Sequence, residues 1–243
     1  MTIKLVPAQE ASYIPADYLS RNRRLYLLAK RLLDVVVSAA LLVILAPLFL
    51  LIALCIKLDS PGSVIFSQKR VGRWNRNSDG EQTPVFTFHK FRSMYQNADS
   101  GVHQRYVESF ITGNKRFVAE CQQNQAVYKL ERDPRITRFG RFLRKTSLDE
   151  LPQLVNVLKG DMSLIGPRPA LPYEVAQYKS WHYRRLEATP GITGLWQVEA
   201  RSTVPFNEMV NMDIQYIEHQ ALWLDLKILL QTVPTVLSGR GAG

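Results

Sequence analysis

The feature that most constrains this fold is a run of 22 residues without a charged side chain, from Val35 to Ile56. As a helix the run would extend about 33 Å, enough to cross a hydrocarbon core of about 30 Å. It is too long for the apolar core of a secretory signal. Pro47 lies near its middle, where a proline removes a backbone hydrogen bond and clashes with the preceding turn. We therefore predict a membrane helix that is broken near Pro47.

Basic residues flank this run on both sides. Positive residues mark the cytoplasmic side of a membrane segment, and here both ends carry that mark. A straight span would place one basic flank outside, whereas a helix broken at Pro47 would dip into the inner leaflet and return. Both arrangements stay open, although the charge rule favours the re-entrant one. A buried core helix is a third alternative, which the length of the run disfavours. The flanking residues are Arg21, Arg23, Arg24, Lys30 and Arg31 before the run, and Lys57, Lys69, Arg70, Arg73 and Arg76 after it.

A second informative stretch is TSLDELPQ at residues 146–153. The apolar residues that follow recur at helical spacing and Gly160 supplies a stop, so a helix is predicted with Asp149 and Glu150 at its start. Five basic residues precede this pair, and the rigid loop Gly166-Pro167-Arg168-Pro169 follows it. Two carboxylates at the positive end of a helix, surrounded by cations, indicate a site for phosphate chemistry. The basic residues are Arg135, Arg138, Arg141, Arg144 and Lys145.

A structural alternative exists for the same pair. Ser147 and Glu150 have the spacing of a capping box, and Asp149 could itself be the N-cap, with Pro152 in the first turn. On the carboxylate pair alone, capping is the more common explanation. A cap needs one partner, however, and does not account for the five basic residues before it.

The charge composition indicates which kinds of partner the protein binds. Arg and Lys exceed Asp and Glu by ten, which favours nucleic acid, phosphorylated substrates or a membrane surface as partners. The two cysteines, Cys55 and Cys121, suggest no disulfide framework and fit a reducing compartment. No group of His and Cys has metal-site spacing, which argues against zinc.

The remaining chain divides into short predicted elements. We expect a loose tail at 1–20, a basic-flanked membrane element at 21–57 and a catalytic domain at 58–243. Strands are predicted at 64–66 and 85–94, and the second would place Phe86, Phe88, Lys90 and Arg92 on one face. Residues 73–84 and 190–197 are expected to be loops, 99–130 a polar helical region, and 206–237 one or two helices. The aromatic and basic residues of 173–186 are typical of a helix at a membrane interface, with an ordinary surface helix as the alternative.

Several segments together resemble the bacterial sugar transferases, which are monotopic polyprenyl-phosphate phosphoglycosyl transferases. The resemblance covers most of the chain from residue 30, and its central block is long and specific. It implies an α+β fold, mostly helical, in which a re-entrant helix-break-helix anchor precedes a compact cytoplasmic catalytic domain with a small β element and interfacial amphipathic helices. The segments are KRLLDVVVSAALLVILAPLFLLIAL at 30–54, KFRSM at 90–94, DPRITRFGRFLRKTSLDELPQLVNVLKGDMSLIGPRP at 133–169, PGITGLWQV at 190–198 and DLKILLQT at 225–232.

The resemblance also implies an activity and a place in the cell. Such an enzyme moves a sugar phosphate from a UDP-sugar to a polyprenyl phosphate, here undecaprenyl phosphate, and releases UMP. It works at the cytoplasmic face of the bacterial inner membrane, as the first membrane step of exopolysaccharide, capsule or O-antigen assembly. A hexose such as glucose or galactose is expected for a member of this length. Whether copies of the chain associate is left open.

Site residues carry over from the resemblance one by one. Asp149 matches the nucleophile that forms an aspartyl-phosphosugar intermediate, and Glu150 the partner that handles the proton or orients the site. Mg²⁺ would bridge the Asp149 carboxylate and the diphosphate. Arg168, Lys90 and Arg144 match phosphate-binding positions. Asp213 is a weaker match, either a metal ligand or a structural carboxylate.

Two departures from the family pattern stand out. Ala46 precedes Pro47 where many members have serine, so the helix break loses a hydroxyl. Glu199-Ala200-Arg201 stands where a small or polar residue, glycine and arginine are usual, which puts a role of this loop in sugar recognition in doubt.

A competing hypothesis is a membrane-tethered nucleic-acid-binding or scaffold protein that uses its positive charge. It requires a recognisable binding module, and the sequence contains none. It also leaves Asp149-Glu150 and the Gly166–Pro169 loop unexplained, so no nucleic-acid partner is expected.

Overall fold

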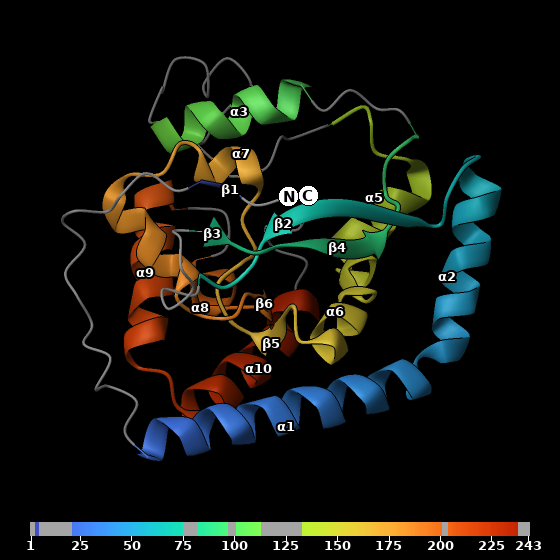
Figure 1. Ribbon diagram of the computed structural model, residues 1–243. Helices are drawn as coiled ribbons and strands as arrows, with labels where there is room; N and C mark the ends of the chain where they lie inside the picture. The colour runs from blue at the N-terminus through green and yellow to red at the C-terminus, as the bar shows by residue number, and fades with distance from the viewer. Residues whose placement is uncertain are drawn as a thin grey trace.

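The computed structural model describes residues 3–4, 21–74, 82–96, 101–112, 133–200 and 204–237. Figure 1 shows helices surrounding small sheets, with the long helix α1 (Arg21–Ile44) along one side of the molecule and α2 (Ala46–Asp59) turning away from its end. The predicted α+β, mostly helical class is therefore confirmed. The expected tail at 1–20 lies outside the described residues, except that Ile3–Lys4 forms a short strand, β1.

The break between α1 and α2 falls where Pro47 was expected to cause one. The two helices are bent by 62°, and Pro47 lies in the first turn of α2, where its missing N–H is not needed. Among the described residues no single helix is long and apolar enough to cross a membrane. The bent pair Arg23–Ile44 and Ala46–Asp59 meets that requirement by length and composition when taken together.

Each sheet has two strands. β2 (Ile65–Val71) pairs antiparallel with β4 (Val85–Phe91) in the register Ser67 opposite His89. Both predicted strands are therefore confirmed, although the first is longer than expected and the second ends three residues earlier. β1 pairs antiparallel with β3 (Gln82–Thr83). β5 (Ser163–Ile165) pairs in parallel with β6 (Gly191–Thr193), so the 190–197 segment is not only a loop but a strand followed by the helix α8 (Leu195–Glu199).

Among the described residues of the domain, the longer helices are α3, α9 and α10. The polar region at 99–130 contains α3 (Gly101–Thr112), and its remainder falls outside the described part of the chain. The predicted one or two helices at 206–237 are two, α9 (Phe206–Glu218) and α10 (Leu222–Leu237). The other elements are α5 (Arg138–Lys145), the 3₁₀ helix η2 (Leu148–Glu150), α6 (Gln153–Lys159), α7 (Pro172–Val175) and the 3₁₀ helix η3 (Ser180–Leu186).

The first half of α1 is fixed to the domain by buried polar contacts. Lys30 forms an ion pair of 3.0 Å with Asp225 on α10, and Tyr26 and Tyr216 donate to the same carboxylate. The Arg31 guanidinium donates to the carbonyl oxygens of the last turn of α6, at 2.5 and 2.8 Å. Cations stabilise the negative end of a helix, so Arg31 of α1 also stabilises the C-terminus of α6.

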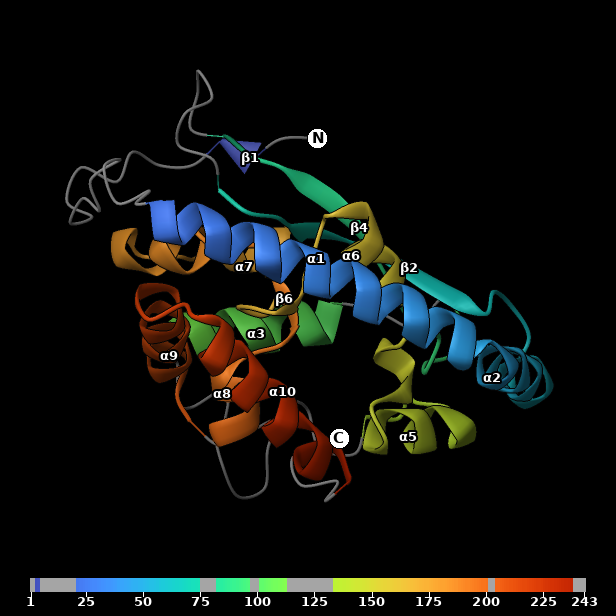
Figure 2. The same ribbon diagram turned by 90° about the horizontal axis from the view of Figure 1, so that it is seen from below.

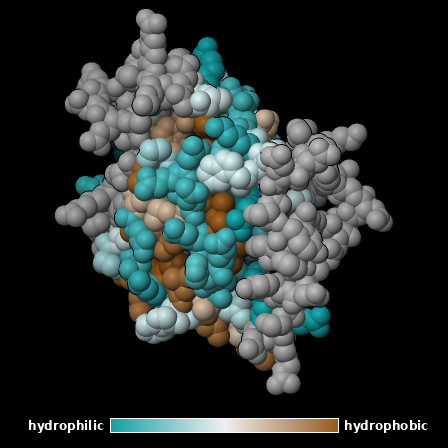
Figure 3. Space-filling model, turned by 90° about the vertical axis from the view of Figure 1, so that its left-hand side faces the viewer, coloured by the Kyte–Doolittle hydropathy of each residue, from teal (hydrophilic) through white to brown (hydrophobic). Residues whose placement is uncertain are grey.

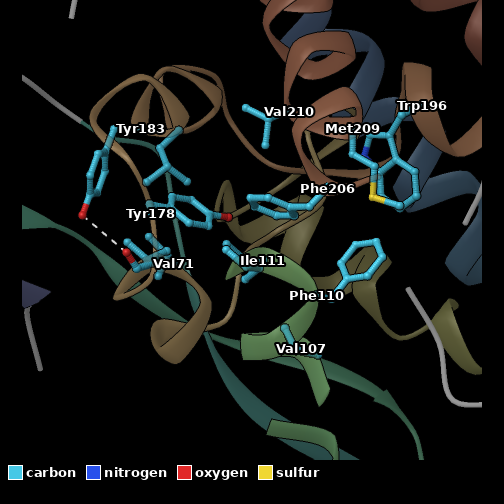
Figure 4. Close-up of a cluster of buried hydrophobic side chains, with 13 residues drawn as sticks. Val71, Val107, Phe110, Ile111, Tyr178, Tyr183, Trp196, Phe206, Met209 and Val210 are labelled. Atoms are coloured by element: carbon cyan, nitrogen blue, oxygen red, sulfur yellow. Dashed lines mark hydrogen bonds between the residues drawn. The ribbon is translucent and has the colours of Figure 1, made fainter. Parts of the chain in front are cut away.

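The prediction of an interfacial helix at 173–186 is wrong. This segment forms the short elements α7 and η3, and its aromatic side chains pack inward. Tyr178 and Tyr183 are buried in a cluster with Phe206, Trp196 and Met209 (Figure 4), so they belong to the core rather than to a membrane surface. The Tyr183 hydroxyl donates to the carbonyl oxygen of Val175 at 3.3 Å, which satisfies its polar group. The side of the molecule seen in Figure 3 mixes hydrophilic and hydrophobic residues.

Candidate active site

The two adjacent carboxylates lie in a tight connection between two helices. After α5, Ser147 adopts a left-handed conformation with φ 56°, and Asp149 and Glu150 follow in η2. A non-glycine residue in this region is strained, and such strain is frequent at functional sites. The turn redirects the chain so that η2 is separate from α6, which begins only at Gln153.

This geometry contradicts both capping alternatives. The Ser147 side chain makes no capping hydrogen bond at η2, and the residue at the N-cap of α6 is Pro152, not Asp149. The prediction that the carboxylates start the α-helix is therefore wrong by one short turn, although the predicted stop at Gly160 is confirmed by its left-handed C-cap conformation.

Cations cluster at Asp149, a residue that is only 7% exposed. Lys90 reaches the site from β4 and Arg144 from the last turn of α5, and both interact electrostatically with the Asp149 carboxylate. Arg168 comes from the Gly166–Pro169 loop and acts on Lys90 and Arg144 as a third positive charge. The structure thus brings together residues that are distant in the sequence, since Lys90 and Arg168 lie 78 positions apart.

Burial lowers the pKa values of two cations in this cluster. It lowers the pKa of the Lys90 ammonium to about 8, an effect that Asp149 opposes and that Arg144, Arg70 and Arg168 reinforce. Burial also lowers the pKa of the Arg144 guanidinium, again opposed by Asp149. Arginine nevertheless stays charged in proteins. A dense set of cations with one central carboxylate is electrostatically poised for a polyanionic ligand.

Arg168 faces the second carboxylate. Its Nη1 lies 3.7 Å from Oε1 of Glu150, and both side chains are about a quarter exposed. Such a loose, partly solvated pair contributes little to stability. The arrangement leaves the planar guanidinium near the site surface, where its geometry suits two phosphate oxygens.

Two strands hold the loop that carries Arg168. The Arg70 guanidinium on β2 donates to the carbonyl oxygen of Pro169 at 2.9 Å, and the backbone N–H of Val71 donates to that of Ala170. On the other side the N–H of Gly191 donates to the carbonyl oxygen of Pro167 at 2.8 Å. A Cβ at Gly166 would meet the carbonyl oxygen of Thr189 at 2.3 Å, so only glycine permits this close approach.

Asp213 lies in a different environment. It is 1% exposed and forms an ion pair of 2.6 Å with Arg185 of η3. Burial raises the pKa of Asp213 to about 6, and the Arg185 guanidinium opposes that shift. The pair joins α9 to η3, which agrees with the structural alternative for this carboxylate.

The donor set bears on the expected Mg²⁺. Among the described residues, no group of three or more His, Cys, Asp or Glu side chains could hold a metal ion by itself. Mg²⁺ is commonly bound by one or two carboxylates, with substrate phosphates and water supplying the other ligands. The adjacent Asp149 and Glu150 fit a metal that arrives with a diphosphate.

Two arginines that support the candidate site and the helix pair were not singled out from the sequence. Arg70 was counted only as a basic flank of the membrane element, yet it is 6% exposed and supports the Pro169 end of the loop. Arg92 was placed on the same face as Lys90, but its guanidinium turns to the end of α2 and donates to the carbonyl oxygens of Ile56, Ser60 and Pro61. The available signal was an arginine inside a predicted strand for Arg92, and an arginine shortly after a predicted strand for Arg70.

Comparisons with known proteins show which sequences this chain resembles. A family model described as bacterial sugar transferase matches residues 25–239. Galactosyl transferase CpsE of Streptococcus agalactiae is 44% identical over 89% of this chain and 44% of its own length. Exopolysaccharide production protein ExoY of Rhizobium meliloti is 38% identical over 88% of both chains. UDP-glucose:undecaprenyl-phosphate glucose-1-phosphate transferase of Caulobacter vibrioides is 40% identical over 87% of this chain and 70% of its own length. The chain thus spans less than half of CpsE and most of ExoY.

Proposed function

The chain belongs to the bacterial sugar transferase family, and from this premise we propose that it transfers a sugar 1-phosphate from a UDP-sugar to a polyprenyl phosphate, releasing UMP. The observation that carries the proposal is the electrostatic interaction of Asp149 with Lys90 and Arg144, beside which Arg168 adds a third positive charge. The name of the Caulobacter relative describes this reaction with glucose, and CpsE is named for galactose. We expect a hexose here too.

The reaction proceeds in two displacements at the phosphorus that bears the sugar. The Asp149 carboxylate attacks that phosphorus and the bond to the bridging oxygen breaks, so that UMP leaves and an acyl phosphate forms on Asp149. An oxygen of the polyprenyl phosphate then attacks the same phosphorus and displaces the Asp149 carboxylate. The product is a polyprenyl diphosphate sugar, and the free aspartate is regenerated.

Each neighbouring group has a role in these steps. Lys90 and Arg144 hold negative oxygens of the diphosphate and offset their repulsion of the Asp149 carboxylate. Arg168 grips two phosphate oxygens with its planar fork. Glu150 orients that guanidinium and accepts the proton of the polyprenyl phosphate oxygen, where it carries one, before that oxygen attacks. Asp149 and Glu150 would hold Mg²⁺. The ion would neutralise diphosphate charge when bound.

The same reaction needs a membrane, since the acceptor is a lipid. We propose that α1 and α2 enter the cytoplasmic leaflet of the inner membrane and return at the break near Pro47. Large apolar side chains are exposed along both helices. α10, which lies beside α1 in Figure 2, exposes a further row of apolar side chains, which would lie at the membrane interface. These side chains are Leu25, Leu28, Leu32, Val36 and Val43 on α1, Leu50, Leu51, Leu54 and Leu58 on α2, and Trp223, Leu226, Leu230 and Val233 on α10.

The activity can be tested with purified protein in detergent. It is incubated with Mg²⁺, undecaprenyl phosphate and one UDP-sugar from a panel of hexoses and N-acetylhexosamines, and UMP is measured. The proposal predicts UMP release that depends on the lipid and is fastest with one sugar. Asp149→Asn, which removes the charged attacker, should lower the rate by orders of magnitude. Absence of UMP with every sugar, or a normal rate in Asp149→Asn, would contradict the proposal.

A further inference from the structure

Asn156 is a fully buried polar residue in the middle of α6, with an exposed fraction of 0%. Its side chain reaches across to β4. The amide oxygen accepts a hydrogen bond of 3.1 Å from the backbone N–H of His89, and the amide nitrogen donates one of 2.7 Å to the carbonyl oxygen of Thr87. The second proton of that nitrogen is directed to the Asp161 carboxylate, at 3.2 Å. All the donors of this amide are therefore used.

The amide takes the place of a neighbouring strand. Along β4 the even-numbered residues direct their backbone groups to β2. The hydrogen bond from the Arg92 N–H to the Val64 carbonyl oxygen, just beyond β4, has the same direction and fixes this alternation. The odd-numbered Thr87 and His89 direct theirs to the opposite edge, because backbone groups alternate along a strand. Asn156 satisfies one acceptor and one donor on this edge, as a pairing strand would.

Asp161 fixes which way the amide points. If the amide of Asn156 were flipped, its oxygen would face the Thr87 carbonyl oxygen and the Asp161 carboxylate, while its nitrogen would face the His89 N–H. All three contacts would then be repulsive. The network therefore allows one orientation, and in this orientation the amide holds α6 opposite Thr87 and His89 of β4.

Both elements that this contact joins lead directly to the reacting groups. Lys90 follows His89 on β4, and Asp149 precedes Asn156 by seven residues, through η2 and the first turn of α6. η2 itself also packs against β4. Because only every second residue of β4 turns its backbone groups toward α6, the next matching position of α6 would move Asp149 by about 7 Å relative to Lys90.

We propose that Asn156 is a positioning residue, which sets the register of β4 against α6 and thereby holds the Lys90 ammonium within electrostatic reach of the Asp149 carboxylate. The inference rests on the proposed function of this site. A buried, hydrogen-bonded asparagine that only stabilises the fold is the competing explanation, and it predicts a different pattern of mutant kinetics.

The test is a double-mutant cycle between Asn156 and Lys90, with UMP release and UDP–Mg²⁺ affinity as separate readouts. The variants are Asn156→Ala, Lys90→Ala and the double variant, with Asn207→Ala as control. Asn207 also uses its amide oxygen to bond a histidine, His182, but at η3. A residue that acts through Lys90 loses its effect once Lys90 is gone.

We expect Asn156→Ala to lower kcat/KM by about 10²-fold, since small displacements of reacting groups have costs of that order. The double variant should match Lys90→Ala within about twofold, and Asn207→Ala should match wild type. Losses that multiply in the double variant would overturn the inference. If Asn156→Ala does not fold, Asp161→Ala replaces it in the same cycle, because it keeps Asn156 and removes only the group that orients its amide.

The two readouts separate this inference from the proposed function. Wild-type protein that binds UDP with Mg²⁺ but releases no UMP contradicts the transferase proposal, and the cycle is then read from the dissociation constants for UDP. Non-additive affinities would support the role of Asn156, and additive ones would overturn it. Wild-type protein that neither binds UDP nor releases UMP contradicts both.

Discussion

The guanidinium of Arg92 donates a hydrogen bond of 2.6 Å to the carbonyl oxygen of Ser60 and another of 3.0 Å to its hydroxyl. The same side chain bonds the carbonyl oxygens of Ile56 and Pro61, so a buried cation closes the negative end of α2. Lys90 lies two residues earlier on the same segment and interacts with the Asp149 carboxylate. One short stretch of chain therefore connects the end of the helix pair with the candidate active site.

We predict that Arg92→Lys destabilises the protein although it keeps the charge. An ammonium cannot reach all these oxygens at once, and unsatisfied buried carbonyls cost about 1–3 kcal/mol. For a chain of this size the midpoint of thermal unfolding should fall by roughly 3–8 °C. Ser60→Ala is the control, because it removes only the hydroxyl contact and should have a small effect. Equal midpoints for Arg92→Lys and wild type would show that the contacts at the end of α2 contribute nothing.

The pH dependence of kcat/KM should report on Lys90. Its pKa is lowered to about 8 by burial, so the ammonium that holds phosphate is lost as the pH rises through that value. Activity should therefore decline above about pH 8. The free energy of unfolding should instead rise with pH between about pH 8 and the ordinary lysine pKa. In that range the unfolded chain binds a proton that the folded protein has lost.

Lys90→Arg is the matched variant for this pH profile. Because arginine keeps its charge, the decline near pH 8 should move to higher pH even if the maximal rate is lower. An unchanged alkaline limb in Lys90→Arg would assign the titration to another group.

Arg168→Lys should be costly at constant charge. If the guanidinium grips two phosphate oxygens, a lysine offers a point charge without the planar fork, and kcat/KM should fall by about 10-fold or more. Arg138→Lys, at an exposed position of α5, is the control for a generic arginine replacement. Equal activity of Arg168→Lys and wild type would reduce Arg168 to a general positive charge.

The re-entrant topology predicts that both ends of the helix pair face the cytoplasm. Single cysteines at Arg24 and Ser63, both exposed, are introduced after Cys55 and Cys121 are replaced by serine. Gly62 is unsuitable, because a Cβ there would lie 1.7 Å from the Gln96 side chain. Both cysteines should react with an impermeant thiol reagent in inverted vesicles and not in intact spheroplasts. Labelling of one position only from the periplasmic side would mean that the segment spans the bilayer.

Local patterns predicted the elements whose cause is local. The break near Pro47, strands β2 and β4 and the end of α6 at Gly160 follow from residue types that act on their own neighbours. The segment 173–186 was misjudged because alternating aromatic and basic residues fit an interface and a core equally well. The decisive contact, between Arg185 and Asp213, joins residues 28 positions apart.

In the candidate site, too, local patterns identified some residues, while features that depend on distant contacts were missed. Asp149, Glu150 and Arg168 were named from charge density and from resemblance to a family, and the structure places them with Lys90 and Arg144. The left-handed Ser147 could not be foreseen, because serine has no particular preference for that conformation. Asn156 looked like one polar residue in an amphipathic helix, since its partners are backbone groups of a distant strand.

The central claim is that Asp149 carries the sugar phosphate during turnover. The most direct measurement is intact and peptide mass spectrometry of the protein after incubation with Mg²⁺ and its preferred UDP-sugar, without the lipid acceptor. The account predicts a mass increase of one hexose phosphate on the peptide that contains Asp149, which disappears when undecaprenyl phosphate is added and does not form in Asp149→Asn. A hexose phosphate adduct on any other residue, or its formation in Asp149→Asn, would contradict the account.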